Sequence, residues 1–139
     1  MNIDIAKSEV IHFVGIGGIG MSGLALIMNG QGFKIQGSDK SFNKNIERLK
    51  KNKIKFFLGH ASANIKKATI LVVSSAIKNN NIELLEAKKK NLPIYKRGDM
   101  LAHITSLKKN IVVAGSHGKT TTTSLIASIF AKAKLDPTI

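Results

Sequence analysis

The segment GIGGIG at residues 15–20 constrains the fold of this chain more than any other feature. It follows Val10–Val14, an apolar run typical of a buried strand, and it precedes a segment whose apolar residues have helical spacing. In this context the pattern G-x-G-x-x-G predicts a strand, a tight turn and a helix whose first N–H groups bind a pyrophosphate. The sequence therefore predicts a Rossmann-like unit at its start.

Each glycine of this loop has a separate expected task. Gly15 permits the tight turn, Gly17 lets the backbone approach a pyrophosphate, and Gly20 lets the helix pack against the strand. Asp39 follows about twenty residues later, at the end of the next expected strand, where a carboxylate can bind ribose hydroxyls. NAD, FAD and nucleotide sugars present similar groups to such a loop, so these residues leave the ligand open.

Short apolar runs alternate with helical patterns over residues 1–107, which predicts an α/β fold with a parallel sheet flanked by helices. The expected strands are Val10–Val14, Phe33–Gln36, Ile54–Leu58, Ala68–Val73 and Leu92–Tyr95. The expected helices run from Ile19 to about Asn29 and over Asn43–Asn52, Ile82–Lys90 and Arg97–Ser106.

A second glycine loop, GSHGKTT at residues 115–121, follows the apolar run Ile111–Ala114 and opens an expected helix from about Lys119 to Lys132. Backbone N–H groups of such a loop cradle phosphates, Lys119 would reach the β and γ oxygens, and the Thr120 hydroxyl could ligate Mg²⁺. The loop is shorter than the Walker A pattern, because its leading glycine is Gly115.

The polar stretch from Ser106 to Asn110 is the expected domain boundary. It separates a Rossmann-like domain, residues 1–107, from residues 108–139, which match the first strand, phosphate loop and helix of an ATP-binding domain. A parallel strand needs neighbours and cover on both faces. We therefore expect this second domain to be cut short.

The formal net charge of +14 raises the question of a nucleic-acid partner. The lysines are scattered, and one Tyr without any Trp offers little for stacking on bases, so we expect no specific nucleic acid. No run approaches the roughly 20 apolar residues of a membrane span, and the start lacks a secretory signal pattern. The lack of cysteine excludes disulfides and thiolate metal sites. We expect a cytoplasmic location and no membrane partner, and the oligomeric state stays open.

Five segments, in order along the chain, resemble the Mur ligases and among them the alanine-adding member. They are IHFVGIGGIGMSGLA from residue 11, GSD from residue 37, VVSSAI from residue 72, RGDML from residue 97 and AGSHGKTTTTS from residue 114. The pair Gly59-His60 also resembles a glycine–histidine pair of that family. The resemblance covers essentially the whole chain.

This resemblance implies a ligase that joins the lactyl carboxylate of UDP-N-acetylmuramate to the amine of L-alanine, with ATP and Mg²⁺, through an acyl phosphate in peptidoglycan synthesis. It implies that Lys119 and Thr120 act in catalysis and that Thr120 holds the metal. The implied substrate-binding residues are Gly15, Gly17, Gly18, Gly20, Asp39, His60, Ser74, Ser75 and Arg97. The implied ATP-binding residues are Gly115, Ser116, His117, Gly118, Lys119, Thr120 and Thr121.

Three alternatives stay open at this point. One is the ligase that attaches a recycled tripeptide to the same sugar nucleotide, because the amine is chosen by a domain that the family carries beyond Ile139. Another is a non-catalytic nucleotide-sugar-binding module. The third is an NAD-dependent oxidoreductase domain, which would leave GSHGKTT unexplained. Because the family's later domains close over ATP, we expect residues 1–139 alone to have no ligase activity.

Overall fold

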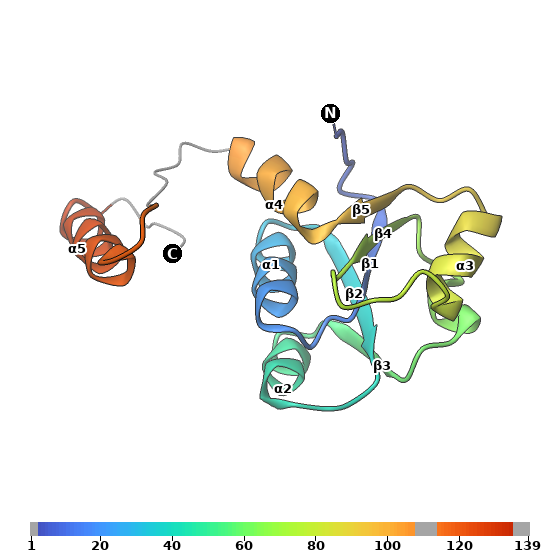
Figure 1. Ribbon diagram of the computed structural model, residues 1–139. Helices are drawn as coiled ribbons and strands as arrows, with labels where there is room; N and C mark the ends of the chain where they lie inside the picture. Colours follow the sequence, from blue (N-terminus) through green and yellow to red (C-terminus); the bar gives the residue numbers. More distant parts are fainter. Residues whose placement is uncertain (1–2, 108–113, 135–139) are drawn as a thin grey trace. The chain divides into compact units, whose positions relative to one another are not determined.

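The computed structural model describes residues 3–107 and 114–134 (Figure 1). The chain divides into two compact units, Met1–Leu107 and Lys108–Ile139.

The first unit is built on one parallel sheet with the strand order β3-β2-β1-β4-β5 (Figure 1). Its strands are β1 (Val10–Val14), β2 (Lys34–Asp39), β3 (Lys55–Leu58), β4 (Ile70–Val73) and β5 (Ile94–Lys96). Its helices are α1 (Ile19–Gly30), α2 (Lys44–Lys51), the short 3-10 helix η1 (Ser62–Ile65), α3 (Ile82–Lys89) and α4 (Arg97–Ser106). This confirms the predicted α/β class with a parallel sheet flanked by helices.

The two faces of the sheet have different cover. Helices α1, α2 and α4 lie on one face, and α3 with η1 lies on the other (Figure 1). Successive side chains of a strand point to opposite faces. Ile11 and Phe13 of β1 therefore enter the larger core below α1, whereas Val14 packs with Leu71 in the smaller core below α3.

Strand β2 is longer than predicted and ends at Asp39 rather than Gln36. The extension forms because Gly37 and Ser38 pair in register with Phe13 and Val14 of β1. The glycine and the serine lowered the apparent strand propensity of this segment, and pairing with a buried neighbour overrides that local preference. The 3-10 helix η1 was not predicted, because a single short turn has no periodicity to detect.

The second unit contains α5 (Lys119–Lys132), which begins where the sequence predicts. Its N-cap, Gly118, has a φ of 73°, in the left-handed region that favours glycine. The predicted strand Ile111–Ala114 lies, apart from Ala114, outside the described residues.

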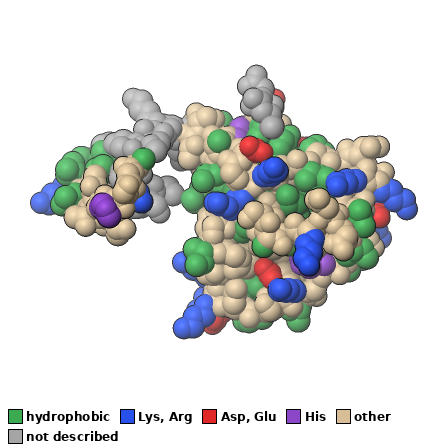
Figure 2. Space-filling model, in the orientation of Figure 1, with side chains coloured by type: hydrophobic (Ala, Val, Ile, Leu, Met, Phe, Trp, Pro, Cys, Tyr) green, Lys and Arg blue, Asp and Glu red, His purple; other side chains and the backbone are tan. Residues whose placement is uncertain are grey.

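The basic side chains do not form one dominant patch on the face drawn in Figure 2, where they are spread among polar and apolar groups. Within the described residues, no helix is long and apolar enough to cross a membrane.

Candidate functional site

The carboxyl ends of the parallel strands bring most of the predicted substrate residues to one edge of the sheet. The loop after β1 carries the glycine motif, and Asp39 ends β2. His60 follows β3, Ser74 and Ser75 follow β4, and Arg97 follows β5. Open parallel sheets bind their ligands at this edge.

Backbone hydrogen bonds to β2 fix the glycine loop. The N–H groups of Gly15 and Ile16 both donate to the carbonyl oxygen of Ser38, at 2.9 and 3.0 Å. Gly15 has a φ of 84°, and a Cβ atom there would lie 3.2 Å from Cβ of Ser74. Gly15 therefore lets the loop turn tightly between β2 and the end of β4.

Gly17 is held by side chains of the segment after β2. Its N–H donates to Oδ2 of Asp39 at 2.9 Å, and its carbonyl accepts from the amides of Asn43 and Asn45 at 3.0 and 2.9 Å. A Cβ atom on Gly17 would lie 2.8 Å from Oδ2 of Asp39. The close approach that requires glycine at residue 17 is thus made within the chain, to Oδ2 of Asp39.

Unpaired backbone N–H groups and a positively charged side chain lie together at the start of α1. Among the described residues, no acceptor meets the backbone N–H groups of Ile19, Gly20 or Met21, the first three residues of the helix. A Cβ atom built on Gly20 would lie 3.0 Å from Nη1 of Arg97, so the guanidinium lies over the first helical turn. A helix amino terminus already carries partial positive charge, and the Arg97 cation adds to it, so this place favours an anion.

The loop after β4 closes the other side of the glycine loop. The Ser74 N–H donates to the Val14 carbonyl at 3.2 Å, and its hydroxyl accepts from the Ala76 N–H at 3.3 Å. Ser75 is exposed in the same loop. Both serines therefore lie at the carboxyl edge, and the Ser74 backbone is anchored to β1.

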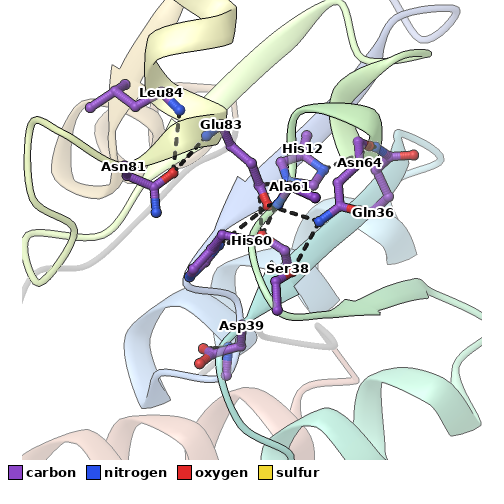
Figure 3. Close-up of polar contacts among 12 residues, drawn as sticks. His12, Gln36, Ser38, Asp39, His60, Ala61, Asn64, Asn81, Glu83 and Leu84 are labelled. Carbon is purple, nitrogen blue, oxygen red and sulfur yellow. Dashed lines mark hydrogen bonds and ion pairs between the residues drawn. The ribbon is translucent and has the colours of Figure 1, made fainter.

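A buried polar cluster lies below this edge, on the α3 side of the sheet (Figure 3). We call it the Glu83 cluster; its members are His12, Gln36, Ser38, His60, Asn64 and Glu83. Glu83 is fully buried, and its carboxylate accepts hydrogen bonds from five donors. Four come from side chains of the cluster and the fifth is the Ala61 N–H, at 3.1 Å.

The pairing within the cluster fixes the proton positions of His12. Nε2 of Gln36 lies 3.0 Å from the Asn64 carbonyl oxygen, which can only accept, so this atom is the amide nitrogen. The same nitrogen lies 2.9 Å from Nδ1 of His12, which must therefore accept. The His12 hydrogen is then on Nε2, 2.5 Å from Oε1 of Glu83. Nε2 of His12 thus donates its hydrogen to the carboxylate.

These contacts keep Glu83 ionised. Burial of the carboxyl by itself raises the pKa of Glu83, but the hydrogen bond from His12 and the coulombic attraction of the His12 ring, together with the hydrogen bonds from Ser38 and Asn64, outweigh burial and lower that pKa from 4.5 to about 2. The position also helps, since Asn81 caps α3 by accepting from the N–H groups of Glu83 and Leu84. A carboxylate in the first turn of a helix is stabilised by the helix dipole.

The sequence interpretation missed His12, Gln36 and Glu83. A signal was present in β1, because a histidine interrupts the apolar run VIHFV. Strand alternation puts His12, Gln36 and Ser38 on one face, and His12 pairs in register with Gln36. No local pattern connects them to Glu83, which lies 71 residues after His12.

The second glycine loop turns through two glycines with positive φ. Gly115 and Gly118 have φ values of 141° and 73°, and no described acceptor meets the N–H groups of Lys119, Thr120 or Thr121. The Lys119 ammonium donates to the Gly115 carbonyl across the loop at 2.5 Å. The backbone N–H groups at the start of α5 are therefore open to an added acceptor.

Comparisons with known proteins agree with this arrangement. The chain is 74% identical, over all of its 139 residues, to a UDP-N-acetylmuramate–L-alanine ligase of Pelagibacter ubique, and it spans about 30% of that relative's length. The solved UDP-N-acetylmuramate–alanine ligase of Thermotoga maritima superposes with a TM-score of 0.80 at 32% identity, covering 89% of this chain and 29% of that one. A murein peptide ligase of Psychrobacter arcticus gives a TM-score of 0.80 at 28% identity, covering 91% of this chain and 27% of that one. The model of the Mur ligase catalytic domain matches residues 10–109. The chain belongs to the Mur ligase family.

Proposed function

We propose that this chain supplies the UDP-N-acetylmuramate-binding domain and the ATP loop of a ligase that adds L-alanine to that sugar nucleotide. The Pelagibacter ubique and Thermotoga maritima relatives are UDP-N-acetylmuramate–alanine ligases, which supports this substrate. The observation that carries the proposal is the set of free N–H groups at Ile19–Met21 beside the Arg97 guanidinium. A pyrophosphate would neutralise both.

We assign the sugar nucleotide to residues 1–107. The pyrophosphate would lie against the first turn of α1, with Gly18 leaving room for its approach and Arg97 on one side. Asp39, through Oδ1, and the hydroxyls of Ser74 and Ser75 would contact the uridine half, while His60 would contact a hydroxyl of the ligand. Gly15 and Gly17 support this site by holding the loop against β2 and β4.

The proposal also assigns residues 108–139 to the start of an ATP-binding domain. Residues Gly115, Ser116, His117, Gly118 and Thr121 would supply backbone groups to the phosphates, as the free N–H groups at the start of α5 favour. Lys119 would neutralise the β and γ phosphates, and the hydroxyl oxygen of Thr120 suits Mg²⁺, a cation that prefers oxygen ligands. The metal would supply charge neutralisation for phosphoryl transfer.

The substitution Gly18→Ala tests the pyrophosphate site with little disturbance of the fold. A Cβ atom on Gly18 would lie 3.7 Å or more from its neighbours, and the φ of −64° suits alanine. A methyl group there would block the approach of a phosphate to the loop, so calorimetry should show binding of UDP-N-acetylmuramate weakened by about tenfold or more. The free energy of unfolding should change by less than about 1 kcal/mol, the cost of a poorer helix cap.

The matched control is Gly23→Ala in the same helix, where a Cβ atom meets nothing within 4 Å. This variant should bind UDP-N-acetylmuramate as the wild type does. If Gly18→Ala binds UDP-N-acetylmuramate as tightly as the wild type does, the pyrophosphate assignment is refuted. The same titration can be made with NADH. If NADH binds more tightly than UDP-N-acetylmuramate, the result would favour the oxidoreductase alternative.

Arg97→Gln tests the charge over α1. Removing a cation that pairs with the pyrophosphate should weaken UDP-N-acetylmuramate binding by about tenfold, because a hydrogen bond to a charged group contributes about 1.5–3 kcal/mol. The affinity of the variant should also fall less steeply with added salt. Isothermal titration at two salt concentrations measures both effects, and Lys96→Gln, the preceding exposed cation, is the control.

A second candidate is the murein peptide ligase activity, favoured by the equal TM-score of the Psychrobacter arcticus relative. Both activities would use the sugar-nucleotide site described above. Providing L-alanine or a peptide to a ligase that contains this segment, with ATP, and measuring ADP release would separate them.

A further inference from the structure

The Glu83 cluster touches the candidate nucleotide site through His60. The His60 side chain is 18% exposed, whereas those of His12 and Glu83 are fully buried. The residue before it, Gly59, donates its N–H to the Asp39 carbonyl at 2.7 Å. His60 therefore emerges from the buried cluster beside the end of β2, where the nucleotide site begins (Figure 3).

Hydrogen bonds connect both sequence neighbours of His60, Gly59 and Ala61, to Glu83, directly or through Asn64. Oε2 of Glu83 accepts from the Ala61 N–H at 3.1 Å and from the Asn64 amide at 2.9 Å. The same Asn64 amide donates to the Gly59 carbonyl at 3.0 Å. The turn Gly59–Ala61 is thus fastened to a fixed negative charge that comes from another part of the chain.

The groups that surround the His60 ring determine which of its nitrogens carries the hydrogen. The Ser38 hydroxyl donates to Oε1 of Glu83 at 2.7 Å, so its oxygen faces Nδ1 of His60, 3.1 Å away, as an acceptor. Oε2 of Glu83, 3.3 Å from the same Nδ1, is also an acceptor. Nδ1 therefore carries the hydrogen, and Nε2 has no partner among the described residues.

We propose that Glu83 is a positioning residue that acts through His60: it keeps the hydrogen on Nδ1 and leaves the Nε2 lone pair to accept a hydrogen bond from a hydroxyl of the sugar nucleotide. This inference rests on the proposed function for its ligand, although the proton assignment does not. In a neutral imidazole, the hydrogen-bond partner of one ring nitrogen determines whether the other nitrogen carries a hydrogen or a lone pair.

Glutamine cannot replace Glu83 in this role. Its NH₂ group would face either the fixed Ala61 N–H or the Nε2–H of His12, whose other nitrogen already accepts from Gln36. In either orientation a donor would meet a donor. In Glu83→Gln the NH₂ group would displace part of the cluster and release the His60 ring from its single proton arrangement.

Nitrogen NMR of the histidine side chains in the full 139-residue chain tests the assignment directly. At a pH where the same spectra show the ring neutral, the wild-type His60 should carry its hydrogen on Nδ1, with the signal identified by its loss in His60→Ala. In Glu83→Gln the population should move toward Nε2–H. Glu86→Gln, at a partly exposed carboxylate of the same helix, should leave the spectrum unchanged. A wild-type ring with its hydrogen on Nε2 would overturn the proposal, even if Glu83→Gln does not fold.

A double-mutant cycle then tests whether Glu83 acts on binding through His60. Calorimetry with UDP-N-acetylmuramate should show Glu83→Gln weakening binding by about tenfold in the wild-type background and by less than about twofold in the His60→Ala background. Equal losses in both backgrounds would contradict the positioning role. If the wild type binds no UDP-N-acetylmuramate while Nδ1–H is observed, the proposed ligand fails and the proton assignment stands.

Discussion

Replacing Gly37 by alanine is expected to lower the free energy of unfolding of the first unit by about 3 kcal/mol, because the core has no room for the methyl group. A Cβ atom on Gly37 would lie 2.5 Å from Cδ1 and 2.7 Å from Cβ of Ile16, and 2.8 Å from the Phe13 carbonyl oxygen. A side-chain rotation could move the Ile16 Cδ1 atom only. The Ile16 Cβ and the Phe13 carbonyl move with the backbone, so the sheet and the glycine loop must shift apart.

Urea denaturation followed by the fluorescence of Tyr95 measures this effect. Tyr95 is the one tyrosine of a chain without tryptophan, and it packs against the larger core of the first unit. Gly23→Ala is the control, since its Cβ atom meets nothing within 4 Å and alanine gains about 1 kcal/mol over glycine inside a helix. The two Gly→Ala changes should thus have opposite signs. A Gly37→Ala variant as stable as the wild type would show that β2 and the glycine loop are not packed as described.

Acid is expected to destabilise the first unit through Glu83. The folded state lowers the pKa of Glu83 from 4.5 to about 2, so the ionised carboxylate stabilises the fold. This contribution is complete above pH 4.5 and is lost as the pH falls from 4.5 toward 2. A difference of that size corresponds to about 3 kcal/mol in total, of which about 2 kcal/mol is lost by pH 3.

Comparing Glu83→Gln with the wild type isolates this term from the other carboxyl groups. The loss of unfolding free energy between pH 6 and pH 3 should be about 2 kcal/mol smaller in the variant, because its side chain binds no proton. Glu86→Gln is the matched control. Glu86 pairs with the partly exposed Lys90 at 3.7 Å, a contact that contributes little, so this variant should follow the wild-type pH curve. Parallel curves for Glu83→Gln and the wild type would contradict the buried carboxylate described here.

The sequence predicted the fold well where the signal is local. Buried parallel strands are short apolar runs, and the helices between them have period 3.6, so their order and type follow from spacing. The ends were less accurate, as at β2, where Gly37 and Ser38 continue the strand. Register with β1 determines that continuation, and register is not a local property.

The glycine loop itself was determined by the sequence: GIGGIG after a strand specifies a turn, where Gly15 takes a positive φ, and a helix with free N–H groups. The tertiary structure alone decided how the loop is used. In the folded chain the N–H of Gly17 donates to Asp39, and Arg97 lies over Gly20. The tertiary structure also joined His12, Ser38 and Glu83 in one buried cluster. These contacts link residues far apart in the chain, and they depend on strand order and on the face to which each side chain points, neither of which a local pattern encodes.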